Sequence, residues 1–364
     1  MKIAVATDVT SEGGVDNYVV ALLDAIQRHG HEVTLLFEQT STSPVASAAA
    51  ARRIRAIPLP LHRQRHAREV TESACLSLLK ESRPDGIHIV GGSPRSCLAL
   101  RFVARSLGIA LIITEQQVDQ QIKLSSAHQA EIRASYATAI AVVFVSSGNR
   151  DTMADAVGLE GVRSVVINNA VDLERIAKYR KLTLRPRTPA RIITIARLAP
   201  EKSLHTLISA AGLLPDELVG ELNIYGEGPA GPELSEQIKR LRLGGRVFLR
   251  GWNADVLPLL RDHDLFVLSS TAEGMPYALL EAMAIGLPAV CTDVPGMVEA
   301  LAGGHAGRIV PQRDPRALAA GISKCLEDPD VTEEKTQMAM SRVHSHYGLT
   351  AIMDQTTRLW EGAI

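Results

Sequence analysis

Short runs of apolar and β-branched residues recur along the chain and alternate with longer stretches of helical period. Strands that are buried on both faces of a parallel sheet read as such continuous apolar runs. In the first half of the chain, the runs predict strands at 2–7, 32–37, 86–90, 110–114, 141–145 and 164–167. Amphipathic stretches predict helices near 15–29, 66–82, 94–107 and 147–157. This alternation predicts a doubly wound α/β domain.

The second half repeats the alternation, with strands predicted at 191–196, 221–226, 246–251, 264–270, 288–292 and 307–310. Between the two series lies RKLTLRPRTP (180–189), a polar, basic segment with two prolines that predicts an interdomain linker. We therefore expect two Rossmann-like domains, 1–178 and 179–345, that face each other across a cleft. A C-terminal helix at 346–364 is expected to cross back to the first domain. Ligands of such sheets bind at the carboxyl ends of the strands.

Composition excludes several classes of function. With 39 basic and 40 acidic residues among 364, no overall field attracts nucleic acid. The four cysteines have no C-x-x-C spacing, which predicts neither a zinc site nor a disulfide framework and fits a reducing cytoplasm. The N-terminus lacks the pattern of a secretory leader, and no apolar run reaches the roughly 18 residues of a membrane span. We expect a cytoplasmic protein.

The first predicted strand leads into DVTSEGGVDNYVVALL, so Gly13 and Gly14 precede a helix. Glycine lets a ligand approach the backbone closely, and the free N–H groups of a helix start attract an anion. The alternative is an ordinary tight connection between a strand and a helix. The segment is not the G-x-G-x-x-G fingerprint, so no nicotinamide cofactor is predicted.

Two cations follow the first strand of the second half, Arg197 and Lys202 in ARLAPEKSLHTLISAA. At the carboxyl edge of a sheet, such a pair could clamp a diphosphate, with a forked contact from arginine and a point charge from lysine. It would also neutralise the charge of a leaving diphosphate. The alternative is a pair of solvated loop charges.

The stretch EGMPYALLEAMAIGLPAV predicts a helix that begins near Met275 or Pro276. Glu281 then lies in its second turn, where its two carboxylate oxygens could accept hydrogen bonds from a ribose diol. Glu273 and Gly274 lie in the preceding loop, nearer the sugar. From local pattern alone, the simpler reading is that Glu273 caps the helix and Glu281 faces solvent.

These motifs resemble the family 4 glycosyltransferases, which are retaining enzymes of the GT-B fold. The resemblance is carried by EGMPYALLEAMAIGLPAVCTDVPGMVEAL, ARLAPEKSL and GWNADVLPLLRDHDLFVLSSTAEG, and in the first half by GGVDNYVVALLDAIQRHGHEVTLL, FVSSGNRDTMADAVG and VINNAVDLERI. It extends over nearly the whole chain. It implies that the first domain binds the acceptor and the second the nucleotide-sugar.

By position, the resemblance implies that Arg197 and Lys202 hold the donor diphosphate, Glu281 the ribose and Glu273 the hydroxyls of the donor sugar. Arg197, Lys202 and Glu273 are thereby the candidate catalytic residues. Further donor contacts are implied for Gly13, Gly14, Gly251, Trp252, Gly274, Met275 and Pro276. The donor is expected to be linked to UDP or GDP, and the reaction to need neither a metal nor a cofactor.

One departure from the family concerns the contact to the transferred sugar. The family often has a histidine after the fifth strand, where this chain reads TEQQVD, so Gln116 occupies that place and Glu115, Gln116 or Gln117 are candidates instead. His88 lies where another histidine of the family often falls. The favoured interpretation of His88 is a satisfied residue at a strand end.

With no Ser-His-Asp arrangement, we expect front-face substitution with retention, in which the departing phosphate takes the proton of the acceptor hydroxyl. The expected setting is polysaccharide biosynthesis. The rival readings are a nucleotide-sugar 2-epimerase and a non-catalytic nucleotide-sugar-binding module. A basic segment over 52–68 suggests peripheral contact with an anionic membrane at its inner face, against the alternative of a solvated basic face; its arginines are Arg52, Arg53, Arg55, Arg63, Arg65 and Arg68.

Overall fold

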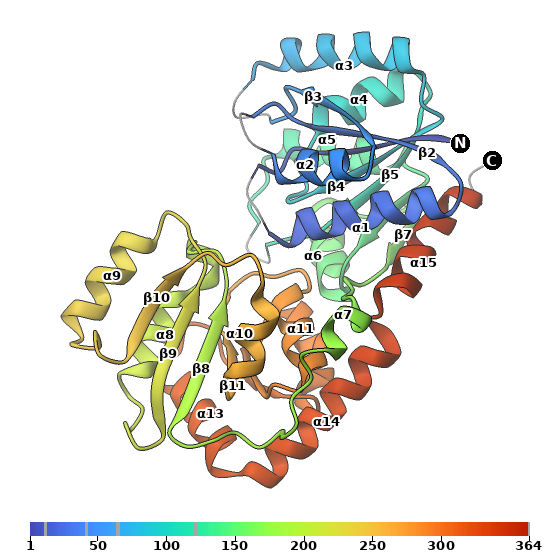
Figure 1. Ribbon diagram of the computed structural model, residues 1–364. Helices are drawn as coiled ribbons and strands as arrows, with labels where there is room; N and C mark the ends of the chain where they lie inside the picture. Colours follow the sequence, from blue (N-terminus) through green and yellow to red (C-terminus); the bar gives the residue numbers. More distant parts are fainter. Residues whose placement is uncertain (11–12, 41–42, 63–65, 120–121, 363–364) are drawn as a thin grey trace. The chain divides into compact units, whose positions relative to one another are not determined.

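The computed structural model describes residues 1–10, 13–40, 43–62, 66–119 and 122–362. The chain forms two compact units, the first from 1–169 and 350–364 and the second from 170–349. Each unit is built on a parallel sheet with helices packed against it (Figure 1).

The sheet of the first unit has the strand order β3-β2-β1-β4-β5-β6-β7, and every neighbouring pair is parallel. Its strands are β1 (Lys2–Thr7), β2 (Glu32–Glu38), β3 (Arg55–Leu59), β4 (Gly86–Gly91), β5 (Ala110–Glu115), β6 (Ala141–Phe144) and β7 (Ser164–Val166). The helices between them are α1 (Gly14–Arg28), α2 (Pro44–Ala51), α3 (Arg68–Ser82), α4 (Leu98–Ser106), α5 (Ser126–Tyr136) and α6 (Ser147–Val157).

The last helix of the chain, α15 (Leu349–Glu361), completes the first unit. Its Trp360 is fully buried, and the indole lies edge-on to His88 of β4, with 6.2 Å between the ring centroids. Gly86 at the start of β4 makes room for this ring, since a Cβ there would collide with it. The terminal helix thereby closes the core around β4.

The sheet of the second unit has the order β10-β9-β8-β11-β12-β13, again all parallel. Its strands are β8 (Ala190–Ile195), β9 (Val219–Tyr225), β10 (Val247–Gly251), β11 (Leu265–Leu268), β12 (Ala289–Thr292) and β13 (Arg308–Val310). Its helices are α7 (Leu173–Ala177), η1 (Pro200–Lys202), α8 (Leu204–Ala211), α9 (Gly231–Arg240), α10 (Val256–Asp262), α11 (Tyr277–Ile285), α12 (Pro295–Ala300), η2 (Ala302–Gly304), α13 (Pro315–Glu327) and α14 (Pro329–His346).

Both sheets confirm the predicted doubly wound architecture, but in the first unit the sequence pattern missed strand β3 and the helices α2 and α5. Strand β3 contains Pro58 and is flanked by arginines, which is poor strand composition; it is tolerated because β3 pairs only with β2 at the edge of the sheet. Helix α5 was missed as well. Its apolar face is small, because Ile132 and Tyr136 carry most of its buried apolar surface.

The compact units differ in their bounds from the expected domains. The division after Asn169 places α7 in the second unit, where it packs against α11, so the expected boundary at 178/179 falls inside that unit. The segment 180–189, predicted as a linker, is also part of the second unit. Arg185 forms an ion pair with Asp330 at 2.6 Å and Arg187 pairs with Asp264 at 2.8 Å, which ties the segment to its own unit.

Candidate functional site

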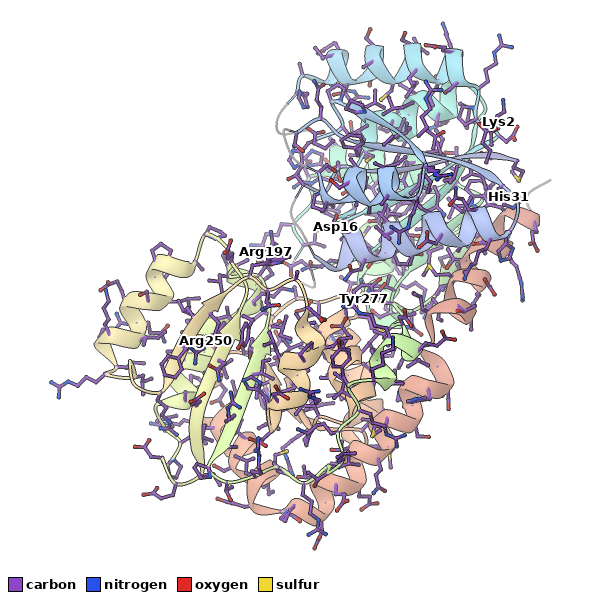
Figure 2. The ribbon with its side chains drawn as sticks, in the orientation of Figure 1. Lys2, Asp16, His31, Arg197, Arg250 and Tyr277 are labelled. Carbon is purple, nitrogen blue, oxygen red and sulfur yellow. The ribbon has the colours of Figure 1, made fainter. Side chains whose placement is uncertain are left out.

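The second sheet reverses its winding direction between β8 and β11, and the candidate donor residues follow these two strands. Connections from β8 lead to β9 and β10 on one side, whereas β11, β12 and β13 lie on the other. The crevice outside the carboxyl ends of such a pair is the usual ligand site of an open α/β sheet. Arg197, labelled in Figure 2, and Lys202 follow β8, and Glu273 follows β11.

Lys202 and Glu273 form a preassembled pair at this edge. The ammonium nitrogen of Lys202 donates to Oε1 of Glu273 at 2.7 Å, and the hydroxyl of Ser270 donates to the same oxygen at 2.7 Å. The side chains are only 14% and 9% exposed. Two neighbouring hydroxyls brace the loops, since Ser269 donates to the carbonyl of Lys202 and Thr292 to the carbonyl of Ser270. A partly buried charged hydrogen bond of this kind fixes both side chains before any ligand arrives.

Arg197 is arranged differently, because half of its side chain is exposed and its guanidinium pairs with Glu201 at 2.6 Å. The turn that carries Glu201 is fastened to the other strand-end loop, since the backbone N–H of Thr271 donates to the carbonyl of Glu201 at 2.8 Å. Arg197 is therefore available to an anion that outcompetes Glu201. Glu201 was not singled out from the sequence.

A glycine loop after β9 fixes the backbone of the Arg197 loop. The N–H of Leu198 donates to the carbonyl of Glu227 at 2.9 Å, and the N–H of Ala230 donates to the carbonyl of Leu198 at 2.9 Å. A Cβ on Gly226 would collide with the carbonyl of Ala196, and one on Gly228 with the backbone of Leu198. Sequence reasoning missed this loop, although its signal, two glycines directly after a predicted strand, is visible in YGEGP.

Glu281 lies in the second turn of α11, which begins at Tyr277 rather than at the expected Met275 or Pro276. Burial raises the pKa of the Glu281 carboxyl to about 7, with Arg175 lowering it and Asp255 raising it. Arg175 and Asp255 form their own ion pair at 2.9 Å. Glu281 is half-buried, and the raised pKa shows a carboxyl that is more desolvated than the solvent-facing residue of the simpler reading.

The loop before α11 is packed tightly. Gly274 and Met275 are buried, and Pro276 is the residue at the N-cap of α11. A Cβ on Gly296 would collide with the carbonyl of Gly274, so a glycine at 296 lets the backbones approach. Tyr277, labelled in Figure 2, starts the helix.

Two of the predicted donor contacts, Gly251 and Trp252, lie at the end of β10 and directly after it. Gly251 ends that strand with φ of 72°, a left-handed conformation that favours glycine, and its carbonyl accepts from the N–H of Gly226 at 2.8 Å. Trp252 is 53% exposed, which is high for a residue of its size. Arg250, labelled in Figure 2, packs over Phe248 at 4.3 Å from the ring centroid.

In the first unit, Gly13 directly precedes α1, which begins at Gly14. The N–H of Gly13 donates to the Asp16 carboxylate at 3.0 Å, so this donor is used within the helix start. Residues 11 and 12 of the same loop lie outside the described residues.

The structure does not agree with a ligand contact for His88 or Glu115. His88 is fully buried, bonds to Thr114 at 2.8 Å, and has a pKa lowered by burial to about 3, so it is neutral. Glu115 is also fully buried; Tyr136 donates to its Oε1 at 2.8 Å and Arg101 at 3.2 Å. Neither side chain has exposed surface through which it could contact a ligand in this structure.

Gln116 is 6% exposed, and its backbone N–H donates to the carbonyl of Gly91 at 3.0 Å. Its role as a sugar contact stays a prediction. The same holds for Gln117, which takes part in an interaction of its own.

The basic segment is partly neutralised. Arg52 pairs with Asp24 at 2.6 Å, and Arg68 pairs with Glu72 and Glu131. Arg63 and Arg65 lie outside the described residues. Over the ranges that the structure describes, no helix combines the length and apolar character needed to cross a bilayer.

Two family models together cover most of the chain. The model for glycosyltransferase family 4 matches residues 12–175, and the model for glycosyl transferases group 1 matches residues 175–342. The boundary between them lies close to the division between the two compact units.

Curated relatives agree with these models. The putative colanic acid biosynthesis glycosyltransferase WcaL of Escherichia coli is 38% identical over 177 residues, 46% of this chain and 44% of that protein. This match and the match to the WcaL protein of Salmonella typhimurium each cover less than half of the relative's length. The phosphatidyl-myo-inositol mannosyltransferase of Mycolicibacterium smegmatis is 26% identical over 359 residues, 96% of this chain and 90% of that protein.

Solved structures show the same fold. Anabaena HepE in complex with UDP-glucose superposes with a TM-score of 0.82 at 19% identity, over all of both chains. The two parallel Rossmann-like units are thus those of the GT-B fold.

Proposed function

The chain belongs to glycosyltransferase family 4, and on that premise we propose that it moves a sugar with retention from a nucleotide-diphosphate-sugar to a hydroxyl of a glycan, a lipid-linked or a small-molecule acceptor. The observation that carries the proposal is the buried Lys202–Glu273 pair at the switch point of the second sheet. Removing a charged pair from water costs free energy of folding, so such a pair is seldom kept for stability alone. Its place at the ligand edge of the sheet therefore favours a role in binding.

The donor binds through charge and hydrogen bonding. The proposed diphosphate contacts are Arg197, released from Glu201, and Lys202, whose ammonium has donors beyond the one used by Glu273. Glu281 accepts from the two ribose hydroxyls. The crystallised neighbour HepE holds UDP and UDP-glucose, which makes UDP the first nucleotide to test and GDP the second.

The reaction proceeds by front-face substitution. The bond between the anomeric carbon and the diphosphate oxygen breaks, and both bonding electrons leave with the diphosphate. The acceptor oxygen then bonds to the same face of the oxocarbenium-like carbon, and its proton passes to the departing phosphate. Arg197 and Lys202 stabilise the leaving charge in place of a metal ion, and Glu273 positions the sugar hydroxyls and Lys202.

Binding titrations test the donor site. We expect UDP and one UDP-sugar to bind wild-type protein, and Glu281→Ala to weaken that binding at least about tenfold, since a charged hydrogen bond is lost. Glu236→Gln is the matched control, because Glu236 forms an exposed pair with Lys239 in the same unit. If no nucleotide-sugar bound, or if both variants bound alike, the proposed donor site would be wrong.

Turnover separates the rival functions. A donor epimerised in a reaction without acceptor would favour a 2-epimerase, and tight donor binding without turnover across acceptors would favour a binding module. For the transferase, Glu273→Gln keeps the shape of the side chain but loses its charge, so we expect turnover to fall at least about tenfold. The contributions of Gly13, Gly14, Gly251 and Trp252, and membrane contact through 52–68, stay predictions.

A further inference from the structure

Each of the two proposed diphosphate cations already has a carboxylate partner at the strand-end edge of the second sheet. The guanidinium of Arg197, labelled in Figure 2, pairs with Glu201 at 2.6 Å, and the ammonium of Lys202 pairs with Glu273 at 2.7 Å. Within each pair the charges cancel. A diphosphate that binds both cations must therefore displace a carboxylate or lie beside one, where it is repelled.

The two pairs differ in how easily they open. The side chains of Lys202 and Glu273 are mostly buried, and the ammonium has three donors, so Lys202 can reach a phosphate without releasing Glu273. The Arg197 side chain is 51% exposed and that of Glu201 is 22% exposed. An ion pair in contact with water opens at a small cost in free energy. Glu201 is therefore the carboxylate that a bound diphosphate displaces.

The backbone of Glu201 is fixed to the loop that follows β11. Its carbonyl accepts from the backbone N–H of Thr271 at 2.8 Å and from the Thr271 hydroxyl at 3.3 Å. Glu201 is also the middle residue of η1, the helical turn that ends with Lys202. A displaced Glu201 carboxylate thus stays within side-chain reach of Arg197, and its charge continues to repel an anion bound there.

This repulsion grows with the charge of the ligand, and the product of the proposed reaction carries more charge than the donor. When the bond between the sugar and the diphosphate breaks, the terminal phosphate gains an ionisable oxygen, and the second pKa of such a phosphate is about 6. At neutral pH the free nucleoside diphosphate therefore carries nearly one more negative charge than the nucleotide-sugar. A carboxylate beside Arg197 opposes the product more strongly than the donor.

We propose that Glu201 is a product-release residue, which competes with the spent nucleoside diphosphate for Arg197 and thereby weakens the binding of product relative to donor. It acts through Arg197 and through its own charge, and it takes no part in bond making or proton transfer. The proposal rests on the proposed function, because it requires that Arg197 holds a nucleoside diphosphate.

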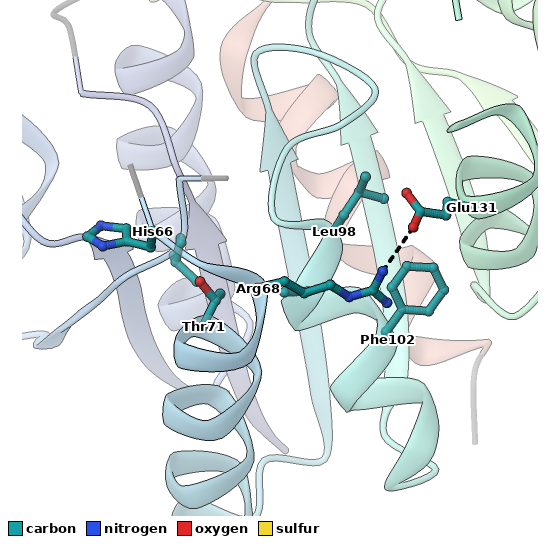
Figure 3. A pocket seen from close by; sticks show the side chains of 8 residues that line it. His66, Arg68, Thr71, Leu98, Phe102 and Glu131 are labelled. Carbon is teal, nitrogen blue, oxygen red and sulfur yellow. Dashed lines mark hydrogen bonds and ion pairs between the residues drawn. The ribbon is translucent and has the colours of Figure 1, made fainter. Parts of the chain in front are cut away.

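Another arginine–glutamate pair of the same spacing provides a matched control. Arg68 pairs with Glu72 at 2.6 Å, and their side chains are 53% and 35% exposed. Figure 3 shows the same guanidinium beside Glu131 and over the ring of Phe102, and these three side chains line a small hollow. Because this pair belongs to the first unit, Glu72→Gln removes a similar carboxylate outside the unit that carries the proposed diphosphate contacts.

Calorimetric titration of the full chain with UDP and with UDP-glucose tests the proposal at neutral pH. Glu201→Gln keeps the shape of the side chain without its charge, so we expect UDP affinity to rise about fivefold and UDP-glucose affinity about twofold. Glu201→Asp keeps the charge and should stay close to the wild-type ratio of the two affinities. Glu72→Gln should leave both affinities unchanged.

The two affinities separate this inference from the proposed function. An equal rise for UDP and UDP-glucose, or no rise for UDP, would show that Glu201 does not discriminate product from donor. Weaker binding of both ligands by Glu201→Gln would show that Glu201 positions Arg197, which would overturn the proposal while the donor site stands. If no nucleoside diphosphate bound the wild type, the proposed function would fail and this inference with it.

Discussion

At the scale of single residues, the raised pKa of Glu281 is the most informative feature of the candidate donor site. Its carboxyl is desolvated in α11, which raises its pKa to about 7 and therefore places its titration near neutral pH. The ionised form offers acceptors to both ribose hydroxyls, whereas the protonated form gives up one acceptor oxygen to its own proton.

We therefore predict that affinity for the nucleotide-sugar falls as the pH decreases through 7. At pH 6 only about one tenth of the Glu281 carboxyls are ionised, so the dissociation constant should be about tenfold higher than at pH 8. Calorimetric titration measures the dissociation constant at each pH. An intact nucleotide-sugar is the ligand of choice, because its diphosphate has no second ionisation near neutral pH that would add its own pH dependence. Glu281→Gln should bind weakly at both values; a wild-type profile that is flat from pH 6 to 8 would contradict the assignment.

The sequence identified candidate donor contacts by residue type and position, but it did not show which residues each of them contacts. These candidates are Arg197, Lys202, Glu273 and Glu281. The pairing of Lys202 with Glu273 joins positions 71 residues apart. The burial of Glu115 and His88 is likewise set by residues distant in the chain, such as Arg101 and Trp360. This is why position alone made Glu115 a candidate sugar contact, whereas the favoured interpretation of His88 as a satisfied strand-end residue agrees with its burial and its hydrogen bond to Thr114.

At the scale of elements, the glycine loop after β9 supports the loop that carries Arg197. Gly228 has φ of 157°, and a Cβ there would meet the backbone of Leu198. Because backbone cannot move aside as a flexible side chain does, a substitution must displace one of the two loops.

We predict that Gly228→Ala weakens donor binding at least about tenfold while the second unit stays folded, since a displacement of about 1 Å is enough to misplace a binding group. Gly245→Ala is the control, because Gly245 has open space around its Cα and lies in the connection before β10. Nucleotide titration and thermal unfolding of both variants provide the comparison. Equal nucleotide affinity in the two variants would show that the loop does not position Arg197.

The sequence pattern located most strands because apolar runs of parallel strands are local features. It missed β3 because Pro58 weakens the strand signal, and only the sheet order reveals that β3 is an edge strand. It assigned 180–189 to a linker because prolines and charges usually mark one. Only the ion pairs of Arg185 and Arg187 show that this segment belongs to the second unit.

At the scale of the whole molecule, the chain builds two cores and returns to the first with α15. Trp360 is the largest fully buried side chain of the described residues, and it packs where Gly86 leaves room. The first unit therefore depends on the far end of the chain.

We predict that Trp360→Ala lowers the unfolding free energy of the first unit by about 3 to 5 kcal/mol through the cavity it creates. The second unit should keep its nucleotide affinity, since its core does not include this side chain. Urea unfolding, with and without UDP, resolves the two effects. Leu182→Ala, at a fully exposed position, is the control and should change neither. Loss of nucleotide binding in Trp360→Ala under native conditions would argue against independent cores.

By itself, the sequence determined the alternation of strands and helices, the loops that follow each strand, and the residue types able to bind a nucleotide-sugar. These are set by local periodicity and by the chemistry of individual side chains. The tertiary structure decided the strand order, which makes β8 and β11 neighbours and brings Lys202 to Glu273. It also decided which carboxyls are desolvated and that Arg68, Phe102 and Glu131 line one hollow. The physical reason is that burial and pairing depend on residues brought together only by packing, which no local pattern encodes.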